Sequence, residues 1–202
     1  LNQSAHFNWP EGVALDSAGN IYVADFANHA IRKVSPAGTN WMTTTLAGLI
    51  GVWGGVDGTN FSARFFHPQG VAVDAAGNLS VRASGNQTLR TISPEGAVSL
   101  LAGAFGVEGS ADGVGGGALF REPRGLALSG SSLYVADSGN GTVRKVSLAG
   151  VVSTLAGSPS LGTADGPGRP ARFAWPKRLT SATGASNTRP SASERHSLTY
   201  SA

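Results

Sequence analysis

Histidine is the residue type in this chain best suited to bind a metal or to act as a general acid or base. The 202-residue chain contains no cysteine and four histidines: His6, His29, His67 and His196. A zinc site needs three or four converging ligands, and neither H-x-H nor H-E-x-x-H spacing occurs. The histidines also do not recur at one matched position of the repeats described below. We therefore expect no metal site, no cofactor and no catalytic histidine.

Other sequence signatures of catalysis are also missing. The chain has no G-x-S-x-G nucleophile elbow, and its serines are scattered through expected turns. Its glycine-rich stretches at 51–55 and 115–117 do not join a strand to a helix, which argues against a phosphate-binding loop. These features predict a protein that is not an enzyme.

Three Asp-Gly pairs recur at one position of the repeat: Asp57–Gly58, Asp112–Gly113 and Asp165–Gly166. Aspartate caps local amides and glycine accepts a positive φ, so the pair favours a tight turn. A calcium loop is the alternative, but it needs several oxygen ligands at alternate positions, and each segment offers about one. We interpret the pairs as structural turns.

Two Asp–Arg pairs recur at a spacing of seven residues: Asp25 with Arg32, and Asp137 with Arg144. On adjacent strands of one hairpin, each pair is expected to form a salt bridge that belongs to the scaffold. The middle copy keeps Arg90 but has Ala83 in place of the aspartate and Ser80 in place of a tyrosine. We expect Arg90 to lack a partner and this copy to be the least stable, provided that the site is buried.

The elements that must position these residues come as three copies of one pattern, over residues 7–48, 61–103 and 120–157, and a fourth copy starts at Phe173. In the first copy, period-two apolar runs separated by turn residues predict four strands, at 12–16, 21–25, 30–34 and 41–47. Several short strands per repeat of roughly 50 residues are typical of β-propeller blades. We predict an all-β propeller fragment of three four-stranded antiparallel blades within residues 1–176.

The repeats resemble the NHL repeat, whose core reads P-x-G-[VL]-A-[VL]-D…G-N-[IL]-Y-V-A-D-x-x-N-x-x-[IV]-R-K-[VI]. The first copy matches it from Pro10 to Val34, the third from Leu133 to Val146, and the second with several lapses. The resemblance implies a β-propeller, usually of six blades. Three blades cannot close a ring, so further blades or a second copy are needed. NHL-like propellers serve as binding platforms for proteins or RNA, as extracytoplasmic sensor domains and, in one branch, as a zinc-dependent lyase.

Charge argues against nucleic acid as a partner. The net charge is +3, but residues 169–202 carry net +5 and residues 1–168 carry net −2. The repeats therefore lack the basic face that phosphate binding needs. No apolar run is long enough to span a membrane. The absence of cysteine does not identify a compartment, and only the resemblance favours an extracytoplasmic one.

After Pro176 the expected strand pattern stops. Residues 177–202 are rich in Ser, Thr, Ala and Arg, without apolar periodicity. A disordered tail and a shifted reading frame both remain open as explanations.

The predicted function is that of a non-catalytic scaffold that binds a protein or peptide through its inter-blade loops. The proposed contact residues vary between the copies while the strands do not: Trp53, Asp57, Phe105 and Glu108. Trp9 and Trp175 precede the proline of a copy, and we expect them to pack between blades. The alternatives are a propeller enzyme of the lyase or hydrolase type, an extracytoplasmic sensor domain, and an RNA-binding propeller.

Overall fold

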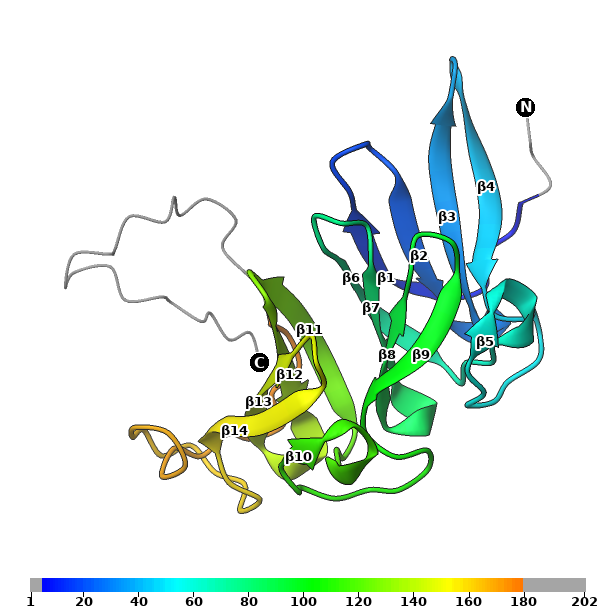
Figure 1. Ribbon diagram of the computed structural model, residues 1–202. Helices are drawn as coiled ribbons and strands as arrows, with labels where there is room; N and C mark the ends of the chain where they lie inside the picture. Colours follow the sequence, from blue (N-terminus) through cyan, green and yellow to red (C-terminus); the bar gives the residue numbers. More distant parts are fainter. Residues whose placement is uncertain (1–4, 180–202) are drawn as a thin grey trace, which may run out of the picture.

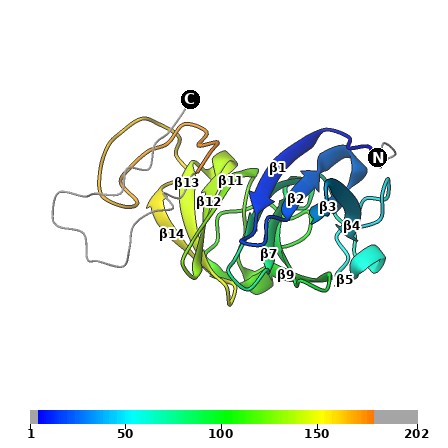
Figure 2. The same cartoon turned by 90° about the horizontal axis from the view of Figure 1, so that it is seen from above.

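A computed structural model describes residues 5–179 of the chain. It contains three antiparallel sheets, placed side by side along an open arc (Figures 1 and 2). The first sheet, blade 1, lies at the N-terminal end of the arc and the third, blade 3, at the other end. This arrangement confirms the predicted all-β propeller fragment.

Each blade is a meander of four strands joined by tight turns. Blade 1 consists of β1 (Pro10–Leu15), β2 (Ile21–Asp25), β3 (Ala30–Ala37) and β4 (Asn40–Ala47). Blade 2 consists of β6 (Pro68–Val73), β7 (Leu79–Ala83), β8 (Thr88–Ile92) and β9 (Ala97–Ala102). Blade 3 consists of β11 (Pro123–Ser129), β12 (Ser132–Asp137), β13 (Thr142–Ser147) and β14 (Val151–Gly157). The first strands are innermost, and β6 lies between β1 and β11.

Blades 2 and 3 also carry a fifth strand, which the sequence pattern did not predict. The crossing segments that connect the blades, residues 48–67 and 103–122, each contain a two-residue strand. These strands are β5 (Gly58–Thr59) and β10 (Gly113–Val114), and they pair antiparallel with β9 and β14. The glycines of the first two Asp-Gly pairs, Gly58 and Gly113, therefore begin outermost strands, whereas Gly166 does not. Blade 1 has no such strand within the described residues.

Short polar contacts close the first hairpin of a blade. In blade 1, Asp16 Oδ1 accepts the backbone N–H of Asn20 at 2.9 Å, and its Oδ2 accepts the hydroxyl of Tyr22 at 3.0 Å. Burial and the neighbouring Asp16 raise the pKa of Tyr22 to about 12. Asp74 and Asn78 repeat the first contact in blade 2, at 2.8 Å. The Asp-x-x-Gly-Asn turn of the repeat therefore determines where β1 and β6 end.

A single 3₁₀ turn joins the second strand of each blade to the third: η1 (Phe26–Asn28), η3 (Ser84–Asn86) and η5 (Ser138–Asn140). The residue after each turn adopts left-handed backbone geometry, at φ 57° for His29, 59° for Gln87 and 58° for Gly141. Residues other than glycine are uncommon in this left-handed conformation, so the backbone conformation of His29 and Gln87 costs free energy. Both side chains make contacts described below.

The hydrophobic cores lie between the blades rather than within them. One core joins Tyr22, Ile31 and other residues of blade 1 to Val71 and Leu79 of blade 2. A second core joins blade 2 to blade 3, and Phe120 lies fully buried within it. A third, smaller core packs Leu179 and Phe173 against blade 3. Each blade is therefore stabilised mainly by its neighbours.

Blade 1 lacks a neighbour on its outer side. Val13 occupies the position of Val71 in the repeat, yet it is 55% exposed where Val71 is 8% exposed. Leu15 on the same strand is likewise exposed. One apolar face of blade 1 is therefore uncovered within the described residues.

The structure contradicts the expected packing of two tryptophans, and most of the predicted tail lies outside the described residues. Trp9 was expected to pack between blades, but it is 73% exposed and adopts left-handed geometry at φ 53°. Trp175 is also exposed and left-handed, at φ 54°. These tryptophans therefore do not fill an inter-blade core. Of the predicted tail at 177–202, residues 180–202 lie outside the described residues, as does His196.

Candidate interaction face

The candidate site is built from three loop positions that recur at each junction between blades. The first is the left-handed residue after the 3₁₀ turn, and the second is the residue before the proline that begins the next blade. The third lies in the crossing segment, where Trp53 and Glu108 occupy matched positions before Gly54 and Gly109. Repeat geometry brings these positions together at each junction, so the side chains present there decide the chemistry.

An aromatic and imidazole cluster forms the junction between blades 1 and 2. The His67 ring stacks on Phe26 with centroids 4.1 Å apart and lies 4.4 Å from Phe66. Trp53 lies 5.0 Å from Phe66 on one side of the cluster, and Trp9 stacks on Phe26 at 6.4 Å on the other. Aromatic pairs at these distances are favourable beyond the area they bury. The result is a continuous row of rings across two blades.

His29 completes this cluster. Its Nδ1 accepts the backbone N–H of His67 at 3.3 Å, and the two imidazole centroids are 5.0 Å apart. Desolvation by burial, with repulsion from His67, lowers the pKa of His29. Burial also lowers the pKa of His67, against an opposing effect of Glu11. Both imidazoles therefore favour the neutral form, and the Nδ1 acceptor requires it in His29.

The junction between blades 2 and 3 has the same geometry but is polar. Gln87 Oε1 accepts the backbone N–H of Glu122 at 2.9 Å, which matches the contact of His29 with His67. Around it, Glu108 pairs with Arg121 at 3.3 Å, and Arg124 pairs with Glu122 at 3.2 Å. These ion pairs are half-exposed and contribute little to stability. The loop face is therefore aromatic at one junction and charged at the next.

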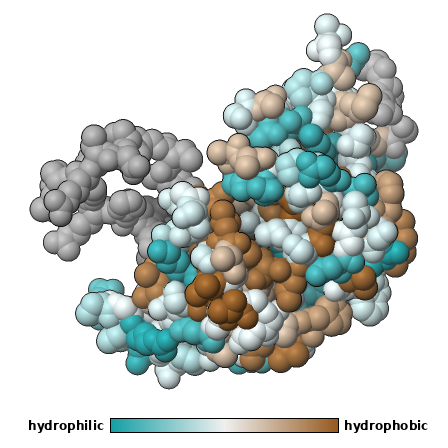
Figure 3. Space-filling model, in the orientation of Figure 1, coloured by the Kyte–Doolittle hydropathy of each residue, from teal (hydrophilic) through white to brown (hydrophobic). Residues whose placement is uncertain are grey.

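The four proposed contact residues lie in different settings in the structure. Trp53 is 61% exposed and belongs to the aromatic cluster. Phe105 is 52% exposed and lies on Gly55, because a Cβ at that glycine would come within 2.0 Å of its ring. Figure 3 shows apolar side chains gathering along the lower part of the molecule, where Figure 1 places β10 and neighbouring loops. Trp53 and Phe105 remain candidate contacts.

Asp57 binds other groups of the same protein. One of its carboxylate oxygens pairs with Nη2 of Arg90, and Oδ2 accepts the backbone N–H of Leu100 at 3.1 Å. The expectation that Arg90 lacks a partner was therefore wrong. A carboxylate from the crossing segment, 33 residues away in the chain, takes the place of the aspartate lost at Ala83. Asp57 is a structural residue in the first instance, although half of it is exposed.

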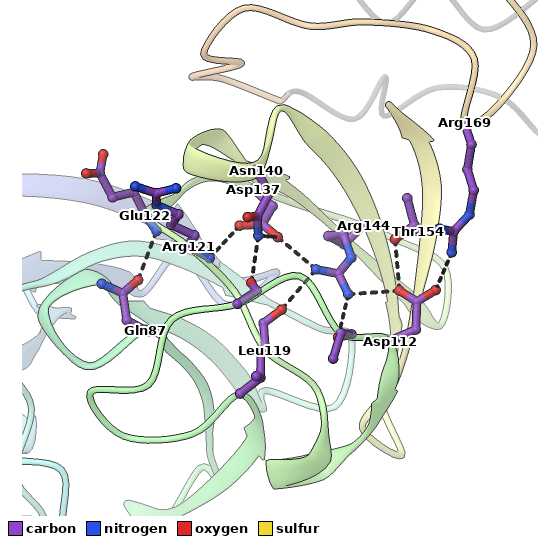
Figure 4. Close-up of polar contacts among 12 residues, drawn as sticks. Gln87, Asp112, Leu119, Arg121, Glu122, Asp137, Asn140, Arg144, Thr154 and Arg169 are labelled. Atoms are coloured by element: carbon purple, nitrogen blue, oxygen red, sulfur yellow. Dashed lines mark hydrogen bonds and ion pairs between the residues drawn. The ribbon is translucent and has the colours of Figure 1, made fainter. Parts of the chain in front are cut away.

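The two predicted Asp–Arg pairs are present as buried contacts. Arg32 Nη1 lies 3.1 Å from Asp25 Oδ2, and Arg144 Nη1 lies 2.7 Å from Asp137 Oδ2. Asp112 adds a second carboxylate to Arg144, 2.8 Å from its Nη2 (Figure 4). The Asp-Gly aspartates 57 and 112 thus bind the arginine of the following blade, rather than only capping a local turn.

The cation without a carboxylate in blade 2 is Arg82, not Arg90. It replaces the alanine found at the matched positions Ala24 and Ala136. Its Nη1 donates to Gln69 Oε1 at 2.6 Å and to the carbonyl of Pro123, while its buried Nε has no partner in the described structure. Burial lowers the pKa of Arg82 to about 10. Attraction to Glu11 and the two hydrogen bonds offset the desolvation of this side chain only in part.

One small pocket joins two of the proposed contact residues. It has a volume of about 100 Å³ and is lined by Gly55, Asp57, Thr88, Arg90, Leu100 and Phe105. Pockets for small-molecule ligands are typically about 300–1,000 Å³. The pocket is therefore too small for most metabolites.

Within residues 5–179, no three His, Asp or Glu side chains come together as metal ligands would. His29 and His67 are an isolated pair. Over the same residues, the structure has no helix long and apolar enough to span a membrane.

The sequence did not single out several members of the cluster. Phe26, Phe66 and the contact between His29 and His67 were missed, because only blade packing brings these positions together. A signal was available for Phe26, Phe66 and His29, since the matched loop positions of other copies hold polar or small residues such as Ser84, Arg121 and Gly141.

The comparison with known families identifies the repeat. The sequence profile of the NHL repeat matches residues 7–34, which cover β1, β2 and most of β3 with the turns between them. The chain contains an NHL repeat. The other two blades share its fold and its positions, as the three sheets show.

The proteins that this chain is similar to are longer than it is. It is 30% identical over 160 residues to NHL repeat-containing protein 2 of Bos taurus, and the match covers 71% of this chain and 21% of that protein. The fold is similar to an auxiliary nutrient-binding protein of Bacteroides thetaiotaomicron, with a TM-score of 0.67, 18% identity, and coverage of 84% of this chain and 42% of that one. It is also similar to the virginiamycin B lyase of Staphylococcus aureus, solved with quinupristin, with a TM-score of 0.57, 10% identity, and coverage of 89% and 47%. The chain thus spans less than half the length of each.

Proposed function

We propose that the chain is a non-catalytic interaction module that binds a protein or peptide through the loop face of its blades. Fold alone does not decide the function, since both a nutrient-binding protein and a lyase share it. The proposal rests on one observation: a row of rings crosses the junction of blades 1 and 2 and is exposed at its two ends, at Trp53 and Trp9. The rings between them are partly buried.

The chemistry of this row suits recognition of a peptide. Large aromatic side chains contribute contact area at low conformational-entropy cost and are enriched at binding hot spots. The neighbouring ion pairs around Glu108 and Glu122 provide a polar rim beside the aromatic centre. Several exposed aromatic residues in one place are also typical of protein-interaction surfaces.

Peptide selection on the immobilised chain tests this function. Displayed peptides selected on the native protein should lose at least about tenfold in affinity when Trp53 or Phe105 is replaced by alanine, since a truncated hot spot costs more than about 1.4 kcal/mol. Trp41→Ala is the matched control, because Trp41 is an exposed tryptophan on β4, outside the aromatic cluster.

The melting temperature of each variant separates binding from folding. Trp53→Ala and Phe105→Ala should melt close to the parent, because both side chains are more than half exposed. Equal loss of peptide binding in the Trp41→Ala control, or no loss in the other two variants, would contradict the proposed face.

A further inference from the structure

A row of three side chains that crosses the strands of blade 1 fills part of the junction with blade 2. The row is Tyr22, Lys33 and Thr44, which lie opposite one another on β2, β3 and β4. Nζ of Lys33 lies 5.7 Å from the centroid of the Tyr22 ring. Tyr22 is 4% exposed and belongs to the core that blades 1 and 2 share. A phenol ring is therefore part of the packing at this junction.

The matched row of blade 2 has small side chains in place of the two large ones. Ser80 lies opposite Thr91, which lies opposite Ser99. Blade 3 has both large residues at these positions, as Tyr134 and Lys145. Since serine and threonine occupy much less volume than tyrosine and lysine, the junction between blades 2 and 3 contains room that the other rows fill with their own atoms.

A pocket lies at this place. Its volume is about 320 Å³, and the residues that line it include the row itself, Asp74 and Asn78 from the turn after β6, and Leu148 of blade 3. This volume falls within the range of about 300–1,000 Å³ that is typical of small-molecule sites. Both blades that form the pocket belong to the described structure, so it is not the open end of the arc. The turn between β6 and β7 lies at the upper end of blade 2 in Figure 1, away from β10.

Asp74 has one acceptor position that is used in blade 1 but not in blade 2. In blade 1, Asp16 Oδ2 accepts Nδ2 of Asn20 at 2.7 Å and the hydroxyl of Tyr22 at 3.0 Å. Asp74 Oδ2 accepts Nδ2 of Asn78 at 3.0 Å, but it accepts no hydroxyl within residues 5–179. Oδ1 of each aspartate is held by the backbone N–H four residues on, at 2.9 and 2.8 Å. The carboxylate of Asp74 is therefore oriented to receive a phenol hydroxyl.

Ser80 provides a second unused polar group. It is 5% exposed and lines the pocket, and its hydroxyl makes no hydrogen bond in the part of the chain that the structure describes. The hydroxyls of Thr91 and Ser99, in contrast, bond to each other at 2.8 Å. A nearly buried polar group without a partner costs free energy unless a ligand or an ordered water satisfies it. Ser80 and Asp74 thus leave two hydrogen-bonding positions for an occupant of the pocket.

We propose that the junction of blades 2 and 3 binds a small free phenol that carries a polar group para to its hydroxyl. The ring takes the place that Tyr22 fills at the preceding junction, and its hydroxyl donates to Oδ2 of Asp74. In tyrosine the para carbon is the one joined to the backbone, so this end of the ligand ring faces Ser80. The polar substituent pairs with the Ser80 hydroxyl.

The walls of the pocket suit an aromatic ring better than a sugar. Ile92, Ala97 and Leu148 contribute apolar side chains to the lining. These side chains would leave several sugar hydroxyls without partners, whereas a ring buries apolar surface against them. A phenol needs only the two hydrogen bonds at its ends, and the bond to the Asp74 carboxylate is charge-assisted.

A free molecule is the occupant, rather than a tyrosine of another polypeptide. A tyrosine side chain in this orientation would bring its own backbone to Ser80. Because Ser80 is nearly buried on β7, a second backbone has no space there.

Two small alcohols test the site on the intact 202-residue chain. The probe is 4-hydroxybenzyl alcohol, and the control is benzyl alcohol, which lacks the phenol hydroxyl. Titration followed by amide NMR should show saturable binding of the probe with a dissociation constant of about 1 mM or lower. The control should bind at least about tenfold more weakly, since it cannot donate to Asp74. The shifts should map to residues 74–80, Thr91 and Leu148.

Two variants connect the binding to the pocket. Ser80→Tyr supplies the ring covalently and should fold, because blades 1 and 3 carry Tyr22 and Tyr134 at this position. It should bind the probe at least about tenfold more weakly, and its melting temperature should not fall below that of the parent. Asp74→Asn keeps an oxygen that can accept the turn N–H groups but removes the carboxylate charge. It should weaken binding of the probe about tenfold and leave binding of benzyl alcohol unchanged.

Several results would overturn the proposal. No saturation at about 10 mM probe, equal binding of the two alcohols, or undiminished binding by Ser80→Tyr would each do so. Shifts that map to Trp53 and the other rings of the loop face would place the ligand elsewhere and contradict the site. Saturable binding of glucose at this pocket, without binding of the probe, would assign the pocket to sugars instead. The outcome does not depend on the proposed peptide-binding face.

Discussion

His29 accepts the backbone N–H of His67 through its Nδ1 atom at 3.3 Å, and this contact joins the turn of blade 1 to the start of blade 2. Protonation of Nδ1 would remove the acceptor, and protonation of both histidines would place two cationic rings 5.0 Å apart. The contact therefore couples the packing of two blades to the protonation state of one imidazole.

The first prediction concerns pH. Burial lowers the pKa of both His29 and His67 below the ordinary value of about 6.5. The unfolded chain then binds more protons than the folded chain, so their contribution to stability is full above about pH 6.5 and is lost as the pH falls through that value towards the lower folded pKa values. The urea midpoint should be lower at pH 5 than at pH 7.5.

His29→Gln is the matched control for this prediction. Gln87 holds the equivalent position at nearly the same φ and accepts the equivalent N–H without titrating. The variant should fold, and its urea midpoint should depend less on pH between 5 and 7.5. An unchanged pH dependence would assign the effect to other groups.

The second prediction concerns the anchor of the first crossing segment. Asp57→Asn removes the only carboxylate paired with the buried Arg90 in the described structure. Since an unsatisfied buried charge is costly but Asp57 is half-exposed, we expect a loss of about 1–3 kcal/mol in the free energy of unfolding. Asp112→Asn should cost less, because Arg144 keeps Asp137. Chemical denaturation of the two variants side by side decides between this order and the reverse.

The third prediction restores the aspartate that blade 2 lacks. Asp137 accepts bonds from the backbone N–H of Arg121, from Asn140 and from Arg144, and blade 2 presents the matched donors at Phe66, Asn86 and Arg90. Ala83→Asp should therefore raise the free energy of unfolding by about 1 kcal/mol. The gain is smaller than for an unpaired arginine, because Asp57 already binds Arg90. A lower denaturation midpoint would show that desolvation of the new carboxylate outweighs its three hydrogen bonds.

The fourth prediction concerns Arg82, which is buried without a carboxylate. Arg82→Met keeps most of the side-chain volume and removes the buried charge and the unpaired Nε. Replacement of buried charges by apolar residues of similar volume is often neutral or stabilising, so a gain of about 1 kcal/mol is expected. Guanidinium denaturation of the variant and the parent measures it. A clear loss would mean that the bonds to Gln69 and Pro123 outweigh the cost of burying the guanidinium.

The sequence alone was sufficient to predict the four-stranded meander of each blade, but not the fifth strands β5 and β10. Strand positions followed from period-two runs and turn residues, which act over a few neighbouring residues. The Asp-x-x-Gly-Asn turn at 16–20 and the matched turn at 74–78 are examples, since all their contacts lie within one hairpin. Hairpin pairs seven residues apart, such as Asp25 with Arg32, could also be predicted from the sequence, because the strand register places them side by side.

Contacts between distant segments were decided only by the tertiary structure. Asp57 and Arg90 are 33 residues apart, and His29 and His67 are 38 apart. No local pattern specifies such a pair, because the partner depends on how one blade packs on the next and on which crossing segment reaches its arginine. For the same reason the sequence could not show that Trp9 is exposed. Exposure depends on which segments pack beside a residue rather than on the residue itself.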